Sequence, residues 1–132
     1  MKVSVSIGKE SYQTTITAGK HTTIVDEPKE VGGTDLGPTP DQLLLSSLGA
    51  CKAITGRMYA DRKEWKLDKI IINLQVDKEH LKKEKETNIT CEVTLIGDLQ
   101  PEHRERLLSV IDRCPIHRIL TGPVKIESRL ST

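Results

Sequence analysis

The sequence has few aromatic residues: no Phe, one Trp and two Tyr among 132 residues. A core without large rings must be built from Ile, Leu and Val, which bury less area per side chain. A chain of this length fits one domain, and we expect residues 1–132 to form a single domain. The limited area that it can bury favours a homodimer over a monomer.

The sequence also lacks an excess of charge of one sign and lacks long apolar runs. The 20 basic and 19 acidic residues are interspersed and give a formal net charge of +1. Nucleic-acid binders carry a basic stripe and stacking aromatics, so we expect no nucleic-acid partner. The apolar runs are too short to cross a bilayer, and residues 1–10 lack the apolar segment of a secretory signal. These absences predict a cytoplasmic protein with no membrane partner.

The sequence contains three cysteines, Cys51, Cys91 and Cys114. Their odd number and wide spacing do not indicate a disulfide framework. In a reducing compartment we expect free thiols that are buried or reactive. Neither these cysteines nor the four histidines show the spacing of zinc ligands, so the sequence predicts no metal site.

The order of the expected elements indicates an α+β fold with antiparallel sheets. Apolar alternation predicts strands at residues 2–7, 11–17, 21–25, 70–76, 87–96 and 124–130. Helices are expected at residues 37–65 and 101–113, with a further helical turn at 115–120. Residues 26–37 are rich in Gly, Pro and acidic side chains and predict a loop, and the charged residues 77–86 predict an exposed hairpin tip. The predicted order is β-β-β-α-β-β-α-(short α)-β.

The long helix is the central element of the sequence. Thr39 is a good N-cap, and Gln42 three residues later completes a capping box. Spacings of three and four predict one buried stripe, formed by Leu44, Leu48, Cys51, Thr55 and Met58. A second stripe consists of small residues and is expected to pack against a partner helix; it contains Ser46, Gly49, Ala50, Ala53 and Gly56.

Cys51 and Cys114 are the candidates for thiol chemistry. If Pro115 opens a helical turn, Cys114 is its N-cap, and free backbone N–H groups there lower the pKa of a thiol. Cys51 lies in mid-helix and would need a cation from elsewhere in the fold or from a second subunit to ionise. Cys91, on an alternating strand, is expected to be a small buried side chain. A Cys–His hydrolase, with His117 acting on Cys114 or Cys51, is an alternative from the residues alone.

Two segments carry a family resemblance: GPTPDQLLLSSLGAC, and much later RCPIHRIL. The chain resembles the osmotically inducible protein C / organic hydroperoxide resistance (OsmC/Ohr) family. Within it, the pattern GKHTTIVDEP, GGTDLGPTP and YADRKEW is similar to an OsmC-like subgroup. The resemblance implies an OsmC-like fold in an intertwined homodimer, with the two central helices wrapped by antiparallel sheets.

The resemblance also implies a thiol-dependent peroxidase in oxidative-stress defence. Cys51 would be the peroxidatic cysteine, which attacks an organic hydroperoxide and becomes a sulfenic acid. Cys114 would be the resolving cysteine, and a lipoyl or thioredoxin-like dithiol would reduce the resulting disulfide. The resemblance implies no metal or flavin cofactor.

In the family, an acidic residue near the helix start and an arginine from the early strands organise the peroxidatic thiolate. Asp41 occupies the acidic position and would serve the cysteine of a partner helix, since it lies roughly 15 Å along the axis from its own Cys51. The first arginine of this chain is Arg57, so Lys20 and His21 are the possible stand-ins for the family cation. The alternative function is a non-catalytic dimer that senses redox state or binds a small apolar ligand.

Overall fold

The computed structural model describes residues 1–77 and 86–131. It consists of two compact units, Met1–Leu44 and Leu45–Thr132. The elements are β1 (Ser4–Ile7), β2 (Thr14–Ala18), β3 (His21–Val25), the 3-10 turn η1 (Lys29–Val31), α1 (Pro40–Lys63), β4 (Lys66–Val76), β5 (Ile89–Asp98), α2 (Pro101–Ile111) and α3 (Pro115–Thr121). The predicted α+β class with antiparallel sheets is confirmed. The tip of the predicted hairpin, residues 78–85, lies outside the described residues.

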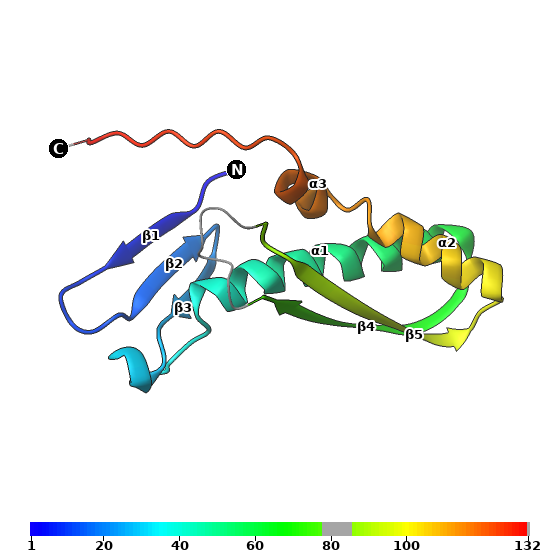
Figure 1. Ribbon diagram of the computed structural model, residues 1–132, viewed down its shortest axis with the longest axis horizontal. Coiled ribbons are helices and arrows are strands. Elements are labelled where there is room, and N and C mark those ends of the chain that lie inside the picture. The colour runs from blue at the N-terminus through cyan, green and yellow to red at the C-terminus, as the bar shows by residue number, and fades with distance from the viewer. Residues whose placement is uncertain (78–85, 132) are drawn as a thin grey trace. The chain divides into compact units, whose positions relative to one another are not determined.

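The first unit is built on a three-stranded meander in the order β1-β2-β3 (Figure 1). Both strand pairs are antiparallel, as the alternation of apolar residues predicted. Val5 of β1 pairs with Ile16 of β2, whereas Ile16 pairs with Thr23 of β3, so apolar residues face each other between β1 and β2 and an apolar residue faces threonine between β2 and β3. Val25, at the end of β3, is buried.

The carboxylate of Asp26 organises the loop that follows β3. Its oxygens accept hydrogen bonds from the hydroxyl of Thr34 at 2.6 Å and from the backbone N–H groups of Glu27 at 2.7 Å and Leu36 at 3.2 Å. These bonds, the hydroxyl of Thr34 foremost, hold the pKa of Asp26 below its usual value. Asp26 therefore maintains the loop conformation and returns the chain to the start of α1.

The predicted capping box at the start of α1 is confirmed. The hydroxyl of Thr39 accepts a hydrogen bond from the N–H of Gln42 at 3.1 Å, and the Gln42 side chain accepts one from the N–H of Thr39 at 3.0 Å. These two bonds satisfy N–H groups that a helix start leaves without intrahelical partners. α1 then continues into the second unit.

In the second unit, α1 runs along the β4–β5 hairpin, and α2 lies beside the C-terminal part of α1 (Figure 1). β4 and β5 pair antiparallel, with Ile72 opposite Val93. Ala60 of α1, Leu67 of β4 and Leu107 of α2 form the buried core cluster. One apolar contact region thus joins the consecutive elements α1 and β4 to α2, which is distant from both in the sequence.

Two members of the small-residue stripe of α1, Gly49 and Gly56, face this chain's own sheet, which the sequence did not predict; the packing of the stripe against a partner helix stays a prediction. A Cβ atom on Gly49 would lie 2.7 Å from Leu74 of β4, and one on Gly56 would lie 2.8 Å from Ile70. The glycines therefore let α1 approach its own sheet closely. On the predicted buried stripe, Leu44 and Met58 are instead exposed.

The predicted strand at residues 124–130 is wrong for the described chain, where residues 123–131 have neither helix nor strand. Ile126 is 85% exposed and Leu130 is 94% exposed. A β-strand requires a neighbouring strand to which it is hydrogen-bonded. The sheets of the described residues are β1-β2-β3 and β4-β5, and neither includes residues 124–130. Alternation alone therefore did not produce a strand here.

Candidate functional site

Two cysteines sixty-three positions apart in the sequence come together in the second unit. Cys51 lies in the middle of α1, and Cys114 is the N-cap of α3. The two thiols lie near enough to interact, because Cys51 is one of the groups that raise the pKa of Cys114. Cys114 is fully buried, while Cys51 is partly exposed. The structure therefore brings the two predicted cysteines close together in their reduced state.

The predicted capping role of Cys114 is confirmed, but its expected effect on the thiol is not. The sulfur accepts a hydrogen bond from the backbone N–H of His117 at 3.4 Å. Burial nevertheless raises the pKa of Cys114 above its usual value, and it outweighs the lowering effect of that hydrogen bond. The neighbouring Cys51 raises the pKa further, whereas the positive charge of Lys52 lowers it.

A buried lysine lies next to this pair. The side chain of Lys52 is 1% exposed, and its Nζ donates to Oδ1 of Asp112 at 3.0 Å. The same Nζ lies 2.8 Å from Nδ1 of His117. A buried charge is tolerated when it is paired and hydrogen-bonded, and both conditions hold here.

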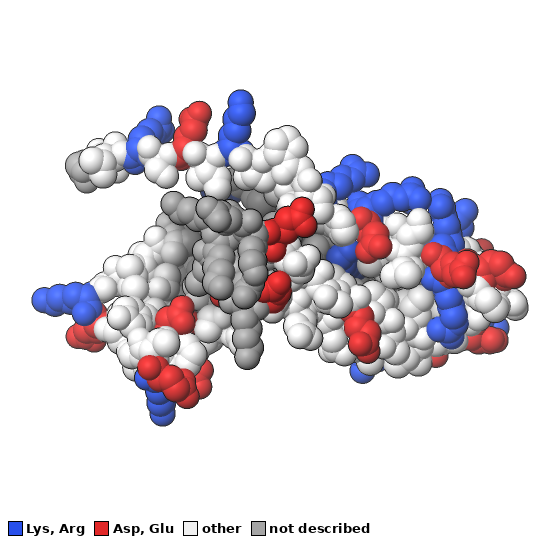
Figure 2. Space-filling model, viewed as in Figure 1, with Lys and Arg blue, Asp and Glu red and all other residues white. Residues whose placement is uncertain are grey.

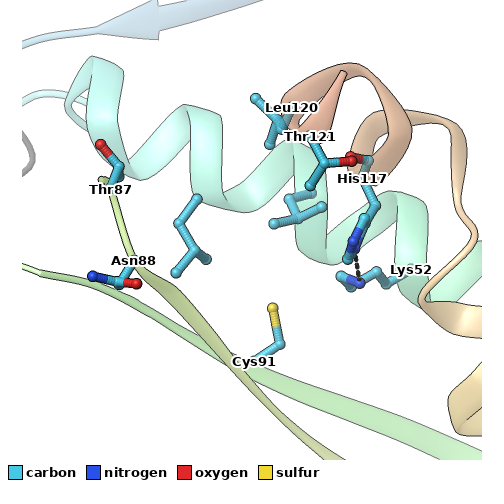
Figure 3. A pocket seen from close by; sticks show the side chains of 9 residues that line it. Lys52, Thr87, Asn88, Cys91, His117, Leu120 and Thr121 are labelled. Carbon is cyan, nitrogen blue, oxygen red and sulfur yellow. Dashed lines mark hydrogen bonds between the residues drawn. The ribbon is translucent and has the colours of Figure 1, made fainter. Parts of the chain in front are cut away.

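Lys52 also lines a cavity of about 260 Å³ (Figure 3). The side chain of Cys91 enters it from β5, with its sulfur toward the side on which Lys52 and His117 meet. Burial raises the pKa of Cys91, while the charge of Lys52 lowers it. The remaining lining residues are Leu48, Thr87, Asn88, Ile89, Leu120 and Thr121. The cavity therefore combines an apolar wall with one buried cation.

The other predicted site residues belong to the first unit. Asp41 lies in the first turn of α1. Lys20 lies in the turn between β2 and β3, and His21, the first residue of β3, pairs with Ala18. All three are exposed. Their parts in cysteine chemistry stay predictions.

Sequence reasoning missed Lys52, although the helix contained a signal for it. One face of α1 is buried at every fourth position, at Leu48, Lys52, Gly56 and Ala60. A lysine on an otherwise apolar and small stripe must either leave the core or find partners within it. Its partners, Asp112 and His117, are 60 and 65 residues away and could not be identified from spacing.

The contacts of His117 give no support to a Cys–His hydrolase. Its backbone N–H, not its ring, contacts Cys114, and its ring Nδ1 faces Lys52. A hydrolase needs the imidazole at the sulfur to take its proton. Within residues 1–77 and 86–131, no group of three His, Cys, Asp or Glu side chains is arranged to hold a metal ion.

Basic and acidic side chains lie intermixed on the face seen in Figure 2. Among the described helices, none has the length and apolar character that crossing a bilayer requires.

Solved structures share this fold. An OsmC-like protein from Mycoplasma pneumoniae is 20% identical, with a TM-score of 0.77 over 92% of this chain and 86% of the other. An organic hydroperoxide resistance protein OsmC from Legionella pneumophila is 20% identical, with a TM-score of 0.67 over 92% and 90%. The organic hydroperoxide resistance protein OhrB of Bacillus subtilis is also 20% identical, with a TM-score of 0.64 over 92% of each chain.

No curated protein is significantly similar to the chain. The sequence profile of OsmC-like proteins, in contrast, matches residues 33–129. This range includes α1, both sheet strands of the second unit and the two cysteines of the pair. The chain belongs to the OsmC-like protein family.

Proposed function

We propose that this protein is a thiol-dependent peroxidase that reduces organic hydroperoxides in oxidative-stress defence. The observation that carries the proposal is that Cys51 of α1 and Cys114, the N-cap of α3, come together as interacting free thiols. Membership in the OsmC-like family, and structural similarity to proteins named for organic hydroperoxide resistance, support it.

In this proposal the partly exposed Cys51 is the peroxidatic residue. Its sulfur attacks the O–O bond of the hydroperoxide, which yields a sulfenic acid on Cys51 and an alcohol. The buried Cys114 then displaces hydroxide from that sulfur, and a disulfide and water form. An external dithiol, lipoyl or thioredoxin-like, reduces the disulfide by exchange and restores both thiols. No cofactor takes part, since sulfur carries the electrons.

We further propose a cytoplasmic homodimer. Asp41 of one subunit would support the cysteine site of the other, with Lys20 or His21 as an added cation. Apolar side chains that the single chain leaves exposed are consistent with a second subunit; on α1 they include Ile54, 58% exposed, and Met58, 66% exposed.

The test is consumption of an organic hydroperoxide in the presence of a dithiol reductant. We expect Cys51→Ser to abolish consumption, because no other thiol would then begin the reaction. Cys114→Ser should leave a sulfenic acid that a dimedone-type reagent can trap. Cys91→Ser is the matched control and should retain nearly full turnover, since Cys91 is not part of the pair. Unchanged consumption in Cys51→Ser would refute the proposal.

The cavity supports a second candidate, a non-catalytic dimer that binds a small apolar molecule or senses redox state. Its apolar wall of Leu48, Ile89 and Leu120 could enclose a small ligand. The same assay separates the two candidates. A single round of disulfide formation without continued consumption of hydroperoxide would favour the sensor over the enzyme.

A further inference from the structure

Lys52 is held in one orientation by two partners on different elements. Nζ reaches Asp112, just after α2, at 3.0 Å and the ring of His117, on α3, at 2.8 Å. An ammonium group has donors only, so Nδ1 of His117 must accept and the ring proton must be on Nε2. The contact therefore fixes both the position of His117 and its tautomer.

His117 connects this lysine to the cysteine pair. The backbone N–H of His117 donates to the sulfur of Cys114 at 3.4 Å, while its ring is held by Lys52. The charge of Lys52 also acts on Cys114 directly and opposes the effect of burial on its pKa. Lys52 thus influences Cys114 both through His117 and through its own field.

We propose that Lys52 is a positioning residue for disulfide formation, placing His117 against Cys114 and supplying positive charge where the attacking sulfur becomes negative. This inference rests on the proposed peroxidase function. In the step concerned, Cys51 is already a sulfenic acid. The sulfur of Cys114 gives an electron pair to the sulfur of Cys51, the S–O bond breaks, and hydroxide leaves with the proton of Cys114 as water.

The groups around Lys52 and Cys114 come from four elements or their ends. α1 contributes Cys51 and Lys52, the end of α2 contributes Asp112, α3 contributes His117, and β5 contributes Cys91 beside Lys52. Asp112 opposes a thiolate, but its side chain is 56% exposed and Lys52 is 1% exposed. Water and salt screen the exposed carboxylate more than the buried ammonium, so the positive charge has the greater effect at the sulfur.

The first experiment titrates Cys114 alone. In a Cys51→Ser, Cys91→Ser background it is the remaining cysteine, and the ultraviolet absorbance of its thiolate gives the titration midpoint without any hydroperoxide. Lys52→Gln removes the charge but keeps a donor, and we expect it to raise the midpoint. Lys52→Arg should bring the midpoint back toward that of the Lys52 parent. Lys66→Gln, at an exposed position of β4, is the matched control and should leave the midpoint unchanged.

The second experiment follows disulfide closure by mass spectrometry after one equivalent of organic hydroperoxide, with all cysteines present. Lys52→Gln should slow closure on the order of tenfold at neutral pH, as expected for a thiolate population reduced by one pKa unit. In the same variant, the rate at which hydroperoxide oxidises the free Cys51 thiol should fall much less than the rate of disulfide closure. Lys52→Met repeats both measurements if the Gln variant does not fold.

The two proposals can fail separately. An unmoved or lowered midpoint in the neutral Lys52 variant overturns the role of Lys52, even if the protein consumes hydroperoxide at full rate. Absence of hydroperoxide consumption in the unmodified protein overturns the peroxidase, while the titration still shows whether Lys52 acts on Cys114.

Discussion

At the scale of single residues, Cys114 is subject to opposing influences. Burial disfavours its thiolate, while the N–H of His117 and the charge of Lys52 favour it. Burial has the larger effect, so the Cys114 thiol is protonated at neutral pH. Such a thiol becomes a nucleophile only as its proton leaves, and in the proposed reaction the nearby cation would favour that step.

The raised pKa of Cys114 leads to a prediction about stability. Below the ordinary thiol value of 9.0 both folded and unfolded chains keep the proton, and the stabilisation from this group is fully present. As pH rises through 9.0 toward the folded-state value, the unfolded chain releases its proton first, and the free energy of unfolding falls. The loss cannot exceed about 1.4 kcal/mol per pH unit for one group.

Urea unfolding under reducing conditions, at pH values on both sides of 9.0, measures this loss. The Cys114→Ala variant should decline less steeply than the unmodified protein. Because burial also raises the pKa of Cys91, adding Cys91→Ala should flatten the curve further. Parallel decline in the unmodified protein and in Cys114→Ala would contradict the assignment.

At the scale of elements, α1 has two faces that the sequence does not distinguish by hydrophobicity. Gly49, Lys52, Gly56 and Ala60 are buried, whereas Ala50, Ile54 and Met58 are exposed. The glycines are on the buried face because the helix must pass close to Leu74 and Ile70 of β4. A small residue therefore marks close approach without showing which element approaches.

Neighbouring substitutions on α1 test this assignment. Gly49→Leu should lower the free energy of unfolding by about 1–3 kcal/mol, because its side chain would enter space that Leu74 fills. Ala50→Leu adds a larger side chain on the exposed face that the proposed dimer would cover, so in the monomer, obtained by adding Ile54→Glu to both variants, it should change stability by less than about 0.5 kcal/mol. Urea unfolding of both variants gives the comparison. Equal losses, or a greater loss in Ala50→Leu, would show that the buried face is wrongly assigned.

At the scale of the whole molecule, the described chain buries little of its apolar content. Val25, Leu48, Leu67, Leu107 and Ile111 are its buried large apolar side chains. Isolated exposed apolar residues are ordinary, but many together indicate a surface that associates with another molecule. The proposed homodimer would provide the missing burial.

The dimer can be tested through the exposed face of α1. Light scattering coupled to size exclusion should give the mass of a dimer for the unmodified protein. Ile54→Glu should shift the mass toward that of the monomer, because a carboxylate would be buried in an apolar interface without a partner. Lys66→Glu changes charge at an exposed position of β4 and is the control. A monomer in the unmodified protein would refute the proposed assembly.

Much of the secondary structure and element order of this protein was determined by residues that are near one another in the sequence. The meander, the capping box of Thr39 and Gln42, the N-cap at Cys114, and the α+β order depend on spacings of a few positions. Alternation, capping and turn chemistry act locally, so a single sequence contains their signals. The paired cysteine contexts carried the family resemblance in the same way.

Tertiary structure decided which partners those local elements meet. It buried Lys52 against Asp112 and His117, raised the pKa of Cys114 that its cap alone would lower, and turned the glycines of α1 toward β4. It also left residues 124–130 without the neighbouring strand that their alternation anticipated. The physical reason is that burial and hydrogen bonding depend on distance in space, and periodicity predicts that a face will be covered without specifying what covers it.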